Sequence, residues 1–355
     1  MDVSGKPMSP SLGLLLFSDY DVAELVSLAQ QSEGLGYQYF WYTDVRFARE
    51  CYIALAAVAL GTKTIRIGTG VTDPYSRHPA ITAAAIATLD ELSGGRAVLG
   101  IGIGGAGFKE LGIEKTLPIA AMREAVEMIN ALIAGEKVTT QGKVFAVDGG
   151  KLSFQPVRSK IPVYFATHGA QMTRLAGQIA DGVLIANVLQ PSAFDFYTGK
   201  LDEGIAKAGR DAATVDVGLR VEACINDDDA AAFTVMRKRV ASRILSQYPH
   251  WDYLAELNVT LPDEFAALAQ ERSPEAAAKA AALLPREAVE AMVLVGSPER
   301  VAEQLARALT PRVTQITLRP HAAPGQKIGD VIAAFANEVV PRALSLVSAE
   351  AGEAT

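Results

Sequence analysis

The sequence predicts an α/β protein, a (β/α)8 TIM barrel with insertions, and three observations lead to this prediction. Short apolar runs typical of buried parallel strands alternate with amphipathic helical segments along the whole chain. Eight such runs occur, which is the number that a closed barrel needs. No Pro- or Ser-rich linker divides the 355 residues, so we interpret 1–355 as a single domain rather than two doubly wound ones.

The predicted strands are mostly continuous apolar runs, as expected for parallel strands that are buried on both faces. They are Leu12–Phe17, Tyr37–Tyr42, Ile65–Val71, Ala97–Ile103, Val163–Thr167, Gly182–Asn187, Val215–Ala223 and Thr314–Leu318. Strands that alternate with helices pair in parallel through right-handed crossovers.

The helices between the strands have recognisable ends. Asp21–Leu35 starts at a possible N-cap aspartate and runs out at two glycines. His78–Leu92 has Pro79 in its first turn, and Pro298–Leu309 follows Ser297 as its N-cap. Further helices are expected over Pro118–Ala134, after Gly169 and after Lys327.

Two insertions interrupt the repeat. Residues 137–154 alternate around a Gln-Gly pair, which predicts a small hairpin outside the barrel. Residues 230–289 separate the seventh strand from the last crossover helix, and their Ala-rich, charged pattern predicts helices.

Composition and charge indicate which binding partners and which cellular compartment to expect. The chain has 33 Lys and Arg against 40 Asp and Glu, a net charge of −7 and no long basic run, which makes nucleic acid an unfavourable partner. Apolar runs such as Tyr52–Leu60 are about half a membrane span. Two thiols, Cys51 and Cys224, are too few for a disulfide framework. We therefore expect a cytoplasmic protein that acts on a small molecule, with no membrane partner.

In barrels of this type, the catalytic groups follow the carboxyl ends of the strands. The residues at those ends are Ser18, Asp19, Thr43, Asp44, Thr69, Gly70, Val71, Thr72, Gly102, Ile103, Gly104, Thr167, His168, Gly169, Asn187, Glu222, Arg319 and His321. The four histidines are far apart and no HExxH motif occurs, so we expect no metal. The absence of a Gly-x-Ser-x-Gly motif gives a covalent hydrolase little support. A set rich in Gly and Thr suits a site that holds a planar cofactor.

Two glycine-containing segments support such a site. Gly102–Gly107 formally matches GxGxxG, but no helix opens inside the motif, so we favour a backbone surface that a ring can approach over a dinucleotide fold. The segment Thr69–Thr72 has a glycine at a strand end, which indicates either a turn or a close approach of the backbone to a cofactor.

A third segment is a candidate phosphate site. Gly169 and Ala170 open a helix whose first N–H groups, together with Arg174, suit an anion. The alternative is that Gly169 only permits a tight turn.

At these residues the sequence resembles a known family. Ile67–Ala80 and Ala87–Gly104, with Trp41–Asp44 and Ala176–Gly182, resemble the bacterial luciferase-like (LLM class) superfamily of flavin- and deazaflavin-dependent oxidoreductases. The motifs are most similar to the F420-dependent methylenetetrahydromethanopterin reductase branch and its bacterial relatives. The resemblance covers essentially the whole chain.

The resemblance implies that a barrel of this family binds the tricyclic ring of coenzyme F420 against a bulge on strand three. That bulge carries a non-prolyl cis peptide, which falls at Gly70–Val71 here, and the cofactor phosphate lies near Gly169 and Ala170. A homodimer is also implied. Two positions depart from the family: Val45 stands where sugar-phosphate dehydrogenases have His, and Leu14–Leu16 stands where the methanopterin reductases have an acid.

The candidate catalytic residues are Asp44, His168 and Glu222. Each has an alternative, non-catalytic role. Asp44 could cap the following loop, and His168 could pack in the interior or contact the cofactor phosphate. Glu222 could form an ion pair with a basic neighbour. Arg319 and His321 are candidates for binding an anionic cofactor tail or for lining a solvated rim. The candidate cofactor-binding residues are Thr69, Gly70, Val71, Thr72, Gly102, Ile103, Gly104, His168, Gly169, Ala170 and Arg174.

The predicted function is hydride transfer between F420 and a small organic substrate. The alternatives are a monooxygenase of the same class that uses reduced FMN and oxygen, and a non-catalytic flavin-binding homologue.

Overall fold

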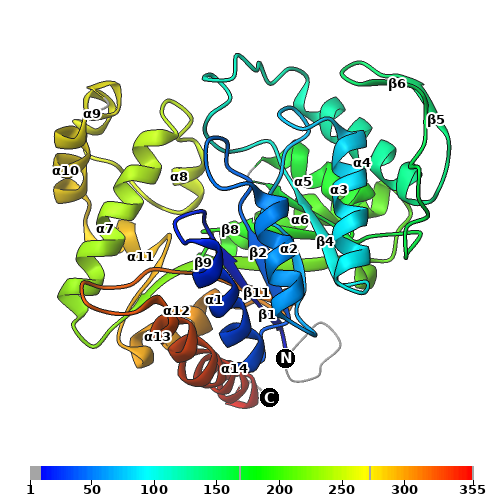
Figure 1. Cartoon of the computed structure of the whole chain (residues 1–355). Coiled ribbons are helices and arrows are strands. Elements are labelled where there is room, and N and C mark those ends of the chain that lie inside the picture. The colour runs from blue at the N-terminus through cyan, green and yellow to red at the C-terminus, as the bar shows by residue number, and fades with distance from the viewer. Residues whose placement is uncertain (1–8, 168, 272, 354–355) are drawn as a thin grey trace. The chain divides into compact units, whose positions relative to one another are not determined.

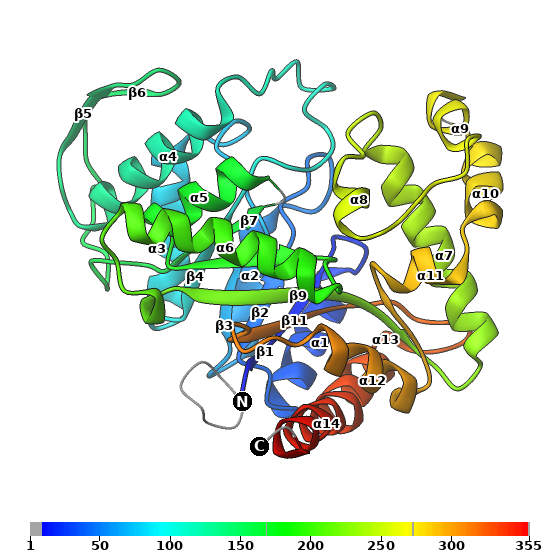
Figure 2. The same cartoon turned by 180° about the vertical axis from the view of Figure 1, so that it is seen from behind.

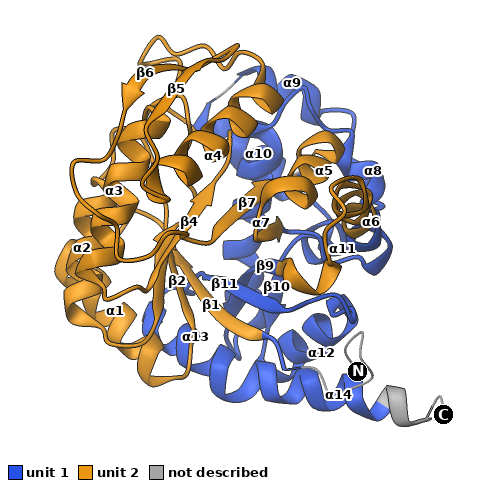
Figure 3. Cartoon of the chain, turned by 90° about the vertical axis from the view of Figure 1, so that its right-hand side faces the viewer, with its two compact units in different colours: residues 1–10, 186–196, 219–355 blue, residues 11–185, 197–218 orange. Residues whose placement is uncertain are grey.

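The computed structural model describes residues 9–167, 169–271 and 273–353. Contacts within it divide the chain into two compact units (Figure 3). Unit 2 consists of residues 11–185 and 197–218, and unit 1 consists of the described residues of 1–10, 186–196 and 219–355. Each unit is described by itself below.

Unit 2 is built from parallel strands that alternate with helices. Its elements are β1 (Ser11–Leu16), α1 (Val22–Gly34), β2 (Tyr39–Tyr42), α2 (Cys51–Gly61), β3 (Arg66–Thr69), α3 (Pro79–Leu92), β4 (Ala97–Ile101), α4 (Pro118–Ile133), β5 (Val138–Gln141), β6 (Ala146–Gly150), β7 (Val163–Thr167), α5 (Ala170–Ile179), β8 (Gly182–Ala186) and the 3₁₀ turn η1 (Ala212–Thr214). The strands pair in the order β1-β2-β3-β4-β7-β8. Helices α1 to α5 each contact the next, and α2, α3 and α4 stand side by side in Figure 1.

Unit 1 contains the later strands and most of the late helices. Its elements are α7 (Asp229–Ser246), α8 (Tyr253–Glu256), α9 (Phe265–Glu271), α10 (Pro274–Leu283), α11 (Arg286–Glu290), β10 (Leu294–Gly296), α12 (Pro298–Ala308), β11 (Gln315–Pro320), α13 (Ile328–Ala334), the π turn η2 (Phe335–Val339) and α14 (Val340–Glu353). Strands β8 and β9 (Asp216–Ile225) and helix α6 (Pro191–Lys207) have residues in both units. In unit 1, β9 lies between β10 and β11. Helices α7, α9 and α10 pack together, as Figure 2 shows from behind.

All eight predicted strands are present, and their parallel pairing with intervening helices confirms the (β/α)8 class. The structure adds β10, which the sequence did not predict because a run of three residues carries no periodicity. It pairs in parallel with the end of β9. That the whole chain forms one domain stays a prediction.

The predicted helix starts are confirmed. The Asp21 carboxylate accepts a hydrogen bond of 2.8 Å from the Glu24 N–H and caps α1. Ser297 caps α12, and Pro79 occupies the first turn of α3. The segment after Lys327 forms α13, η2 and α14, continuous apart from the π turn.

Both insertions have the predicted type of structure. Strands β5 and β6 form an antiparallel hairpin within 137–154. The carboxylate of Glu124 on α4 accepts hydrogen bonds from the N–H groups of Lys143, Val144 and Phe145, which attaches the hairpin turn to α4. Helices α7 to α11 occupy the second insertion.

Strand β3 is shorter than predicted. It ends at Thr69 because the next peptide bond, Gly70–Val71, is cis, at the position that the family resemblance implies. Pairing with β4 resumes at an isolated bridge between Thr72 and Ile101.

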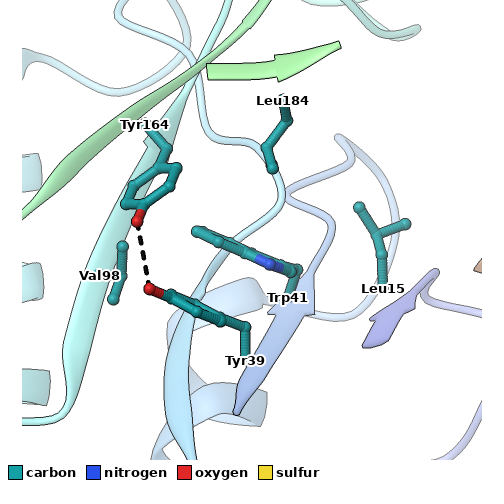
Figure 4. Close-up of a cluster of buried hydrophobic side chains, with 6 residues drawn as sticks. All are labelled: Leu15, Tyr39, Trp41, Val98, Tyr164 and Leu184. Carbon is teal, nitrogen blue, oxygen red and sulfur yellow. Dashed lines mark hydrogen bonds between the residues drawn. The ribbon is translucent and has the colours of Figure 1, made fainter. Parts of the chain in front are cut away.

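An aromatic layer fills the core of unit 2 beside this bond. Trp41 stacks on Tyr39 with ring centroids 5.7 Å apart, and the Tyr39 and Tyr164 hydroxyls are 3.2 Å apart (Figure 4). Leu15, Val98 and Leu184 complete the layer. A Cβ atom added at Gly70 would lie 2.9 Å from the Trp41 Cβ. The layer therefore supports the Gly70–Val71 segment directly.

One helical segment in the described chain, Ile328–Ala349, is long and apolar enough to cross a membrane by length and composition. It packs along α12 and buries Val331, Phe335 and Val339 in unit 1. Core helices of folded proteins pass the same test, so one such segment is weak evidence of a membrane span.

Candidate functional site

Two predicted site residues, Asp44 and Thr72, meet in unit 2. Asp44 follows β2 and Thr72 follows β3, and the ends of these adjacent parallel strands lie together. The Thr72 hydroxyl donates a 2.6 Å hydrogen bond to the Asp44 carboxylate, and the Arg77 Nε lies 3.8 Å from the same oxygen. Burial raises the pKa of Asp44, and the hydrogen bond from Thr72 and the charge of Arg77 only partly oppose this. Asp44 is thus a partly desolvated carboxylate held in a fixed orientation.

Thr72→Val should raise the pKa of Asp44 further, because it removes the hydrogen bond that favours the ionised form. We expect the free energy of unfolding at pH 7 to fall by about 1.5 kcal/mol, the low end for a hydrogen bond to a charged group, because Asp44 retains some solvent contact. Carbon NMR titration of Asp44 and urea unfolding measure the two effects. The exposed Thr88, whose hydroxyl bonds only within its own helix, provides the matched control Thr88→Val. An unchanged Asp44 pKa would contradict this assignment.

The predicted glycine surface also forms in unit 2. Gly70 and Val71 are partly exposed at the end of β3. A Cβ at Gly102 would lie 3.0 Å from a Val71 methyl group and 3.2 Å from the Ala166 carbonyl oxygen. Because Val71 packs this closely, position 102 has little room for a side chain. Gly104 faces open space, and Ile103 is partly exposed. The backbone next to Val71 is therefore open to a flat ligand.

Thr69 has a different role in this structure. Its hydroxyl donates to the Gly100 carbonyl at 2.6 Å and accepts from the Gly100 N–H at 3.1 Å. The side chain is fully buried. Thr69 thus joins β3 to β4 where the backbone departs from the regular ladder.

The sequence analysis missed Arg46, which organises the glycine-rich loop after β4. Its Nε donates to the Ala106 carbonyl at 2.7 Å, and its Nη1 pairs with Asp73 at 2.6 Å. Gly105 and Gly107 have positive φ angles, and a Cβ at either would collide with Arg46. A local motif could not reveal this arginine, because Asp73 and the Ala106 carbonyl group are both distant from it in the sequence.

Two polar atoms at the end of β2 also indicate a bound group. Trp41 Nε1 and Thr43 Oγ1 are buried, and neither has a hydrogen-bond partner among the described residues. Buried polar atoms are normally satisfied, so an unpaired one is a candidate contact for a ligand or ordered water. The alternation along a strand places both side chains on the same face.

The predicted phosphate site lies at the start of α5. None of the described side chains caps this helix at Gly169, and a Cβ at Gly169 would meet nothing within 4 Å. Ala170, the first helical residue, is partly exposed. Arg174 instead pairs with Glu203 on α6. His168 lies outside the described residues.

In unit 1, Glu222 takes the alternative that the sequence left open, ion pairing with basic neighbours. Its carboxylate accepts from Arg239 Nε at 2.7 Å, from Arg319 Nη1 at 3.2 Å and from Asn187 Nδ2 at 3.3 Å, and His321 Nε2 lies 2.8 Å away. Burial alone would raise the pKa of Glu222, but the hydrogen bond with His321 and the surrounding arginines hold it well below its ordinary value. A catalytic role for Glu222 stays a prediction.

The described residues contain no cluster of three His, Cys, Asp or Glu side chains that would hold a metal ion. Unit 2 offers open backbone beside a buried carboxylate, and unit 1 offers a dense array of guanidinium groups.

Comparison with known proteins gives consistent matches. The model of the luciferase-like monooxygenase family matches residues 4–315. A 5,10-methylenetetrahydromethanopterin reductase of Archaeoglobus fulgidus is 40% identical over 231 residues, which are 65% of this chain and 68% of that protein. An F420-dependent glucose-6-phosphate dehydrogenase of Microbacterium testaceum is 34% identical over 56% of this chain and 60% of its own length. The solved F420-dependent tetrahydromethanopterin reductase of Methanopyrus kandleri superposes with a TM-score of 0.84 at 28% identity, covering 94% of this chain and 99% of that one.

Proposed function

Because the chain belongs to the luciferase-like monooxygenase family, we propose that it is an F420-dependent oxidoreductase that transfers a hydride between the deazaflavin and a small organic substrate. This is the reaction class and cofactor that the sequence predicts, and the names of the relatives bear out both. The observation that carries the proposal is the partly exposed Gly70–Val71 segment at the end of β3, at the position where the resemblance implies that the family holds its ring.

The residues of unit 2 fit such a cofactor. Gly70 and Val71, which rest on the aromatic layer, would hold the ring. Thr72, Gly102, Ile103 and Gly104 are the other residues that would contact it. The unpaired Trp41 Nε1 and Thr43 Oγ1 would supply polar contacts. Shape and hydrogen bonding thus both suit a flat heterocycle with polar edges.

The phosphate of the cofactor is assigned to the start of α5, where Ala170 lies at the positive end of the helix dipole, while the Gly169 N–H donates to the Thr167 hydroxyl at 3.3 Å. Arg174 can contact this phosphate only if its ion pair with Glu203 breaks. Thr69 acts indirectly, by shaping the β3–β4 junction. His168 remains a candidate contact on sequence grounds alone.

When bound, F420 supplies the hydride chemistry, and the chain supplies orientation and environment. Asp44, fixed by Thr72 and partly desolvated, is placed to hydrogen-bond near the ring. Val45 in place of His and Leu14–Leu16 in place of an acid argue against both substrates that the relatives' names specify.

Spectroscopic titration tests the cofactor assignment. We expect oxidised F420 to bind with one site per chain and to perturb its own absorbance and fluorescence, and FMN to bind far more weakly. Oxygen consumption with reduced FMN is the companion measurement, because a deazaflavin does not react readily with oxygen. Tight FMN binding without F420 binding would replace the proposal with the FMN-dependent monooxygenase alternative.

We further propose a cytoplasmic homodimer. Helices α2 and α3 lie side by side, and Ile53, Leu60 and Ile81 on them are 69%, 74% and 58% exposed. Apolar side chains gathered on neighbouring helices are typical of a protein interface. Free, buried Cys51 and Cys224 suit a reducing compartment. Sedimentation equilibrium at micromolar concentration distinguishes a dimer from a monomer.

A further inference from the structure

Four arginines of unit 1 converge on one buried carboxylate. Arg220, Arg239, Arg243 and Arg319, called the arginine cluster below, each place a guanidinium nitrogen within 4 Å of Glu222. The Glu222 side chain is 1% exposed, whereas those of the arginines are 12–29% exposed. The carboxylate is therefore enclosed, and the guanidinium groups lie between it and the solvent.

The charges of this group do not balance. Arg220 and Arg239 share the single negative charge of Glu222 and pair with no other carboxylate among the described residues, and the hydrogen bond with His321 adds no negative charge. Burial lowers the pKa of Arg220 to about 9, the charge of Glu222 opposes this, and the other three arginines add to the lowering. Arg220 Nε is buried and has no hydrogen-bond partner within the described chain. Enclosed cations are normally paired, so the cluster has capacity for a further anion.

Glu222 also gives the cluster a fixed shape. It takes two hydrogen bonds from Arg239, through Nε and Nη2, which fixes the plane of that guanidinium group. The Asn187 side-chain oxygen accepts a hydrogen bond from Arg220 Nη2 and so helps to orient that guanidinium group. Planar guanidinium groups fixed in advance suit the oxygens of a phosphate or carboxylate, because little side-chain entropy is lost on binding.

The location agrees with a substrate site. Arg220 and Glu222 lie in β9, Arg319 lies near the carboxyl end of β11, and Asn187 directly follows β8. In (β/α)8 enzymes the groups that bind substrate follow the carboxyl ends of the strands. Helix α7, from the late insertion, contributes the other two arginines. Insertions after barrel strands are where substrate specificity varies.

We propose that the arginine cluster binds an anionic group, a phosphate or a carboxylate, carried by the substrate. This rests on the proposed function and names its substrate class, a small organic acid or phosphate ester. Glu222 is then a positioning residue, which orders the arginines and limits their net charge.

Calorimetric titration of the F420-saturated protein with inorganic phosphate, and separately with acetate, tests the proposal. Saturation with F420 occupies the phosphate site at α5 and leaves the arginine cluster as the remaining site. We expect one phosphate per chain, bound about tenfold more weakly by Arg239→Gln, because the variant loses one charge-assisted hydrogen bond. Lys238→Gln, the same charge change at the exposed neighbouring residue of α7, should leave the affinity unchanged.

The outcomes separate the alternatives. No binding of either anion to the wild type, or equal binding by Arg239→Gln, overturns the proposal. Phosphate binding to the cofactor-free protein that is weakened by Arg239→Gln and abolished stoichiometrically by F420 assigns the cluster to the cofactor and also overturns the proposal. If Arg239→Gln does not fold by circular dichroism, Arg239→Lys, which keeps the charge but not the planar fork, must still weaken binding.

Failure of the proposed function is visible separately, because F420 binding is measured before phosphate is added. If F420 does not bind, the same titrations on the cofactor-free protein still test whether Arg239 contributes to an anion site.

Discussion

Replacing Gly70 by leucine is expected to weaken F420 binding by about 10- to 100-fold while the chain remains folded. An added Cβ would lie 2.9 Å from the Trp41 Cβ and 3.1 Å from a Leu15 methyl group, so the segment must move away from the aromatic layer. Overpacking of this kind costs about 1–3 kcal/mol. About 1.4 kcal/mol corresponds to a tenfold change in affinity, and the displaced segment is the surface on which the ring is proposed to lie.

Fluorescence titration with F420 measures the effect, and Gly70→Ala should give a smaller loss, because it adds only the colliding atom. Gly34→Ala is the matched control, since a Cβ there meets nothing within 4 Å. Thermal unfolding of each variant shows whether the barrel survives. If Gly70→Leu bound F420 as the wild type does, the ring would not lie against this segment.

The fold was accessible from the sequence because it depends on local patterns. Buried parallel strands are apolar throughout, and helix ends such as Asp21 and Ser297 are marked by single capping residues. The three-residue strand β10 shows the limit of this reasoning. It exists because its backbone pairs with the end of β9, and no local pattern records that partner.

The site was accessible only in part, for a related reason. Asp44 and Thr72 were predicted because adjacent strands of a barrel bring their carboxyl ends together, and the structure joins them by a hydrogen bond. Arg46 was missed because it binds the Ala106 carbonyl group and the Asp73 carboxylate, both distant in the sequence, and no local pattern records such partners. Glu222 was recognised as a strand-end residue, but its enclosure depends on two arginines from α7, and the distance from strand to helix is set by tertiary packing.

Replacing Glu222 by alanine is expected to lower the free energy of unfolding by about 3–5 kcal/mol, the cost of removing one partner from a buried ion pair. The change leaves Arg220, Arg239, Arg243 and Arg319 without the carboxylate on which they converge. Urea unfolding at pH 7 measures the loss. The exposed carboxylate of Glu203, which pairs with Arg174 and Lys200, provides the control Glu203→Ala, which should leave the transition unchanged.

The pH dependence gives this prediction a second signature. The pKa of Glu222 lies well below its ordinary value of 4.5 in the folded chain, so the unfolded chain takes up this proton first as the pH falls. The stability that Glu222 contributes is therefore fully present above about pH 4.5 and is lost as the pH falls through the folded pKa. Glu222→Gln cannot titrate, so its unfolding free energy should depend less steeply on pH below 4.5 than that of the wild type.

His321 adds a separate effect at higher pH. Burial lowers its pKa below 6.5 although Glu222 opposes the shift, so the unfolded chain binds this proton before the folded chain does. Wild-type stability should thus begin to fall below pH 6.5, and His321→Gln should remove that first decline while keeping the steeper one below 4.5.

Parallel curves for the wild type and Glu222→Gln below pH 4.5 would show that the carboxylate is not ionised within the arginine cluster, which would contradict the ion pairing on which the anion site depends.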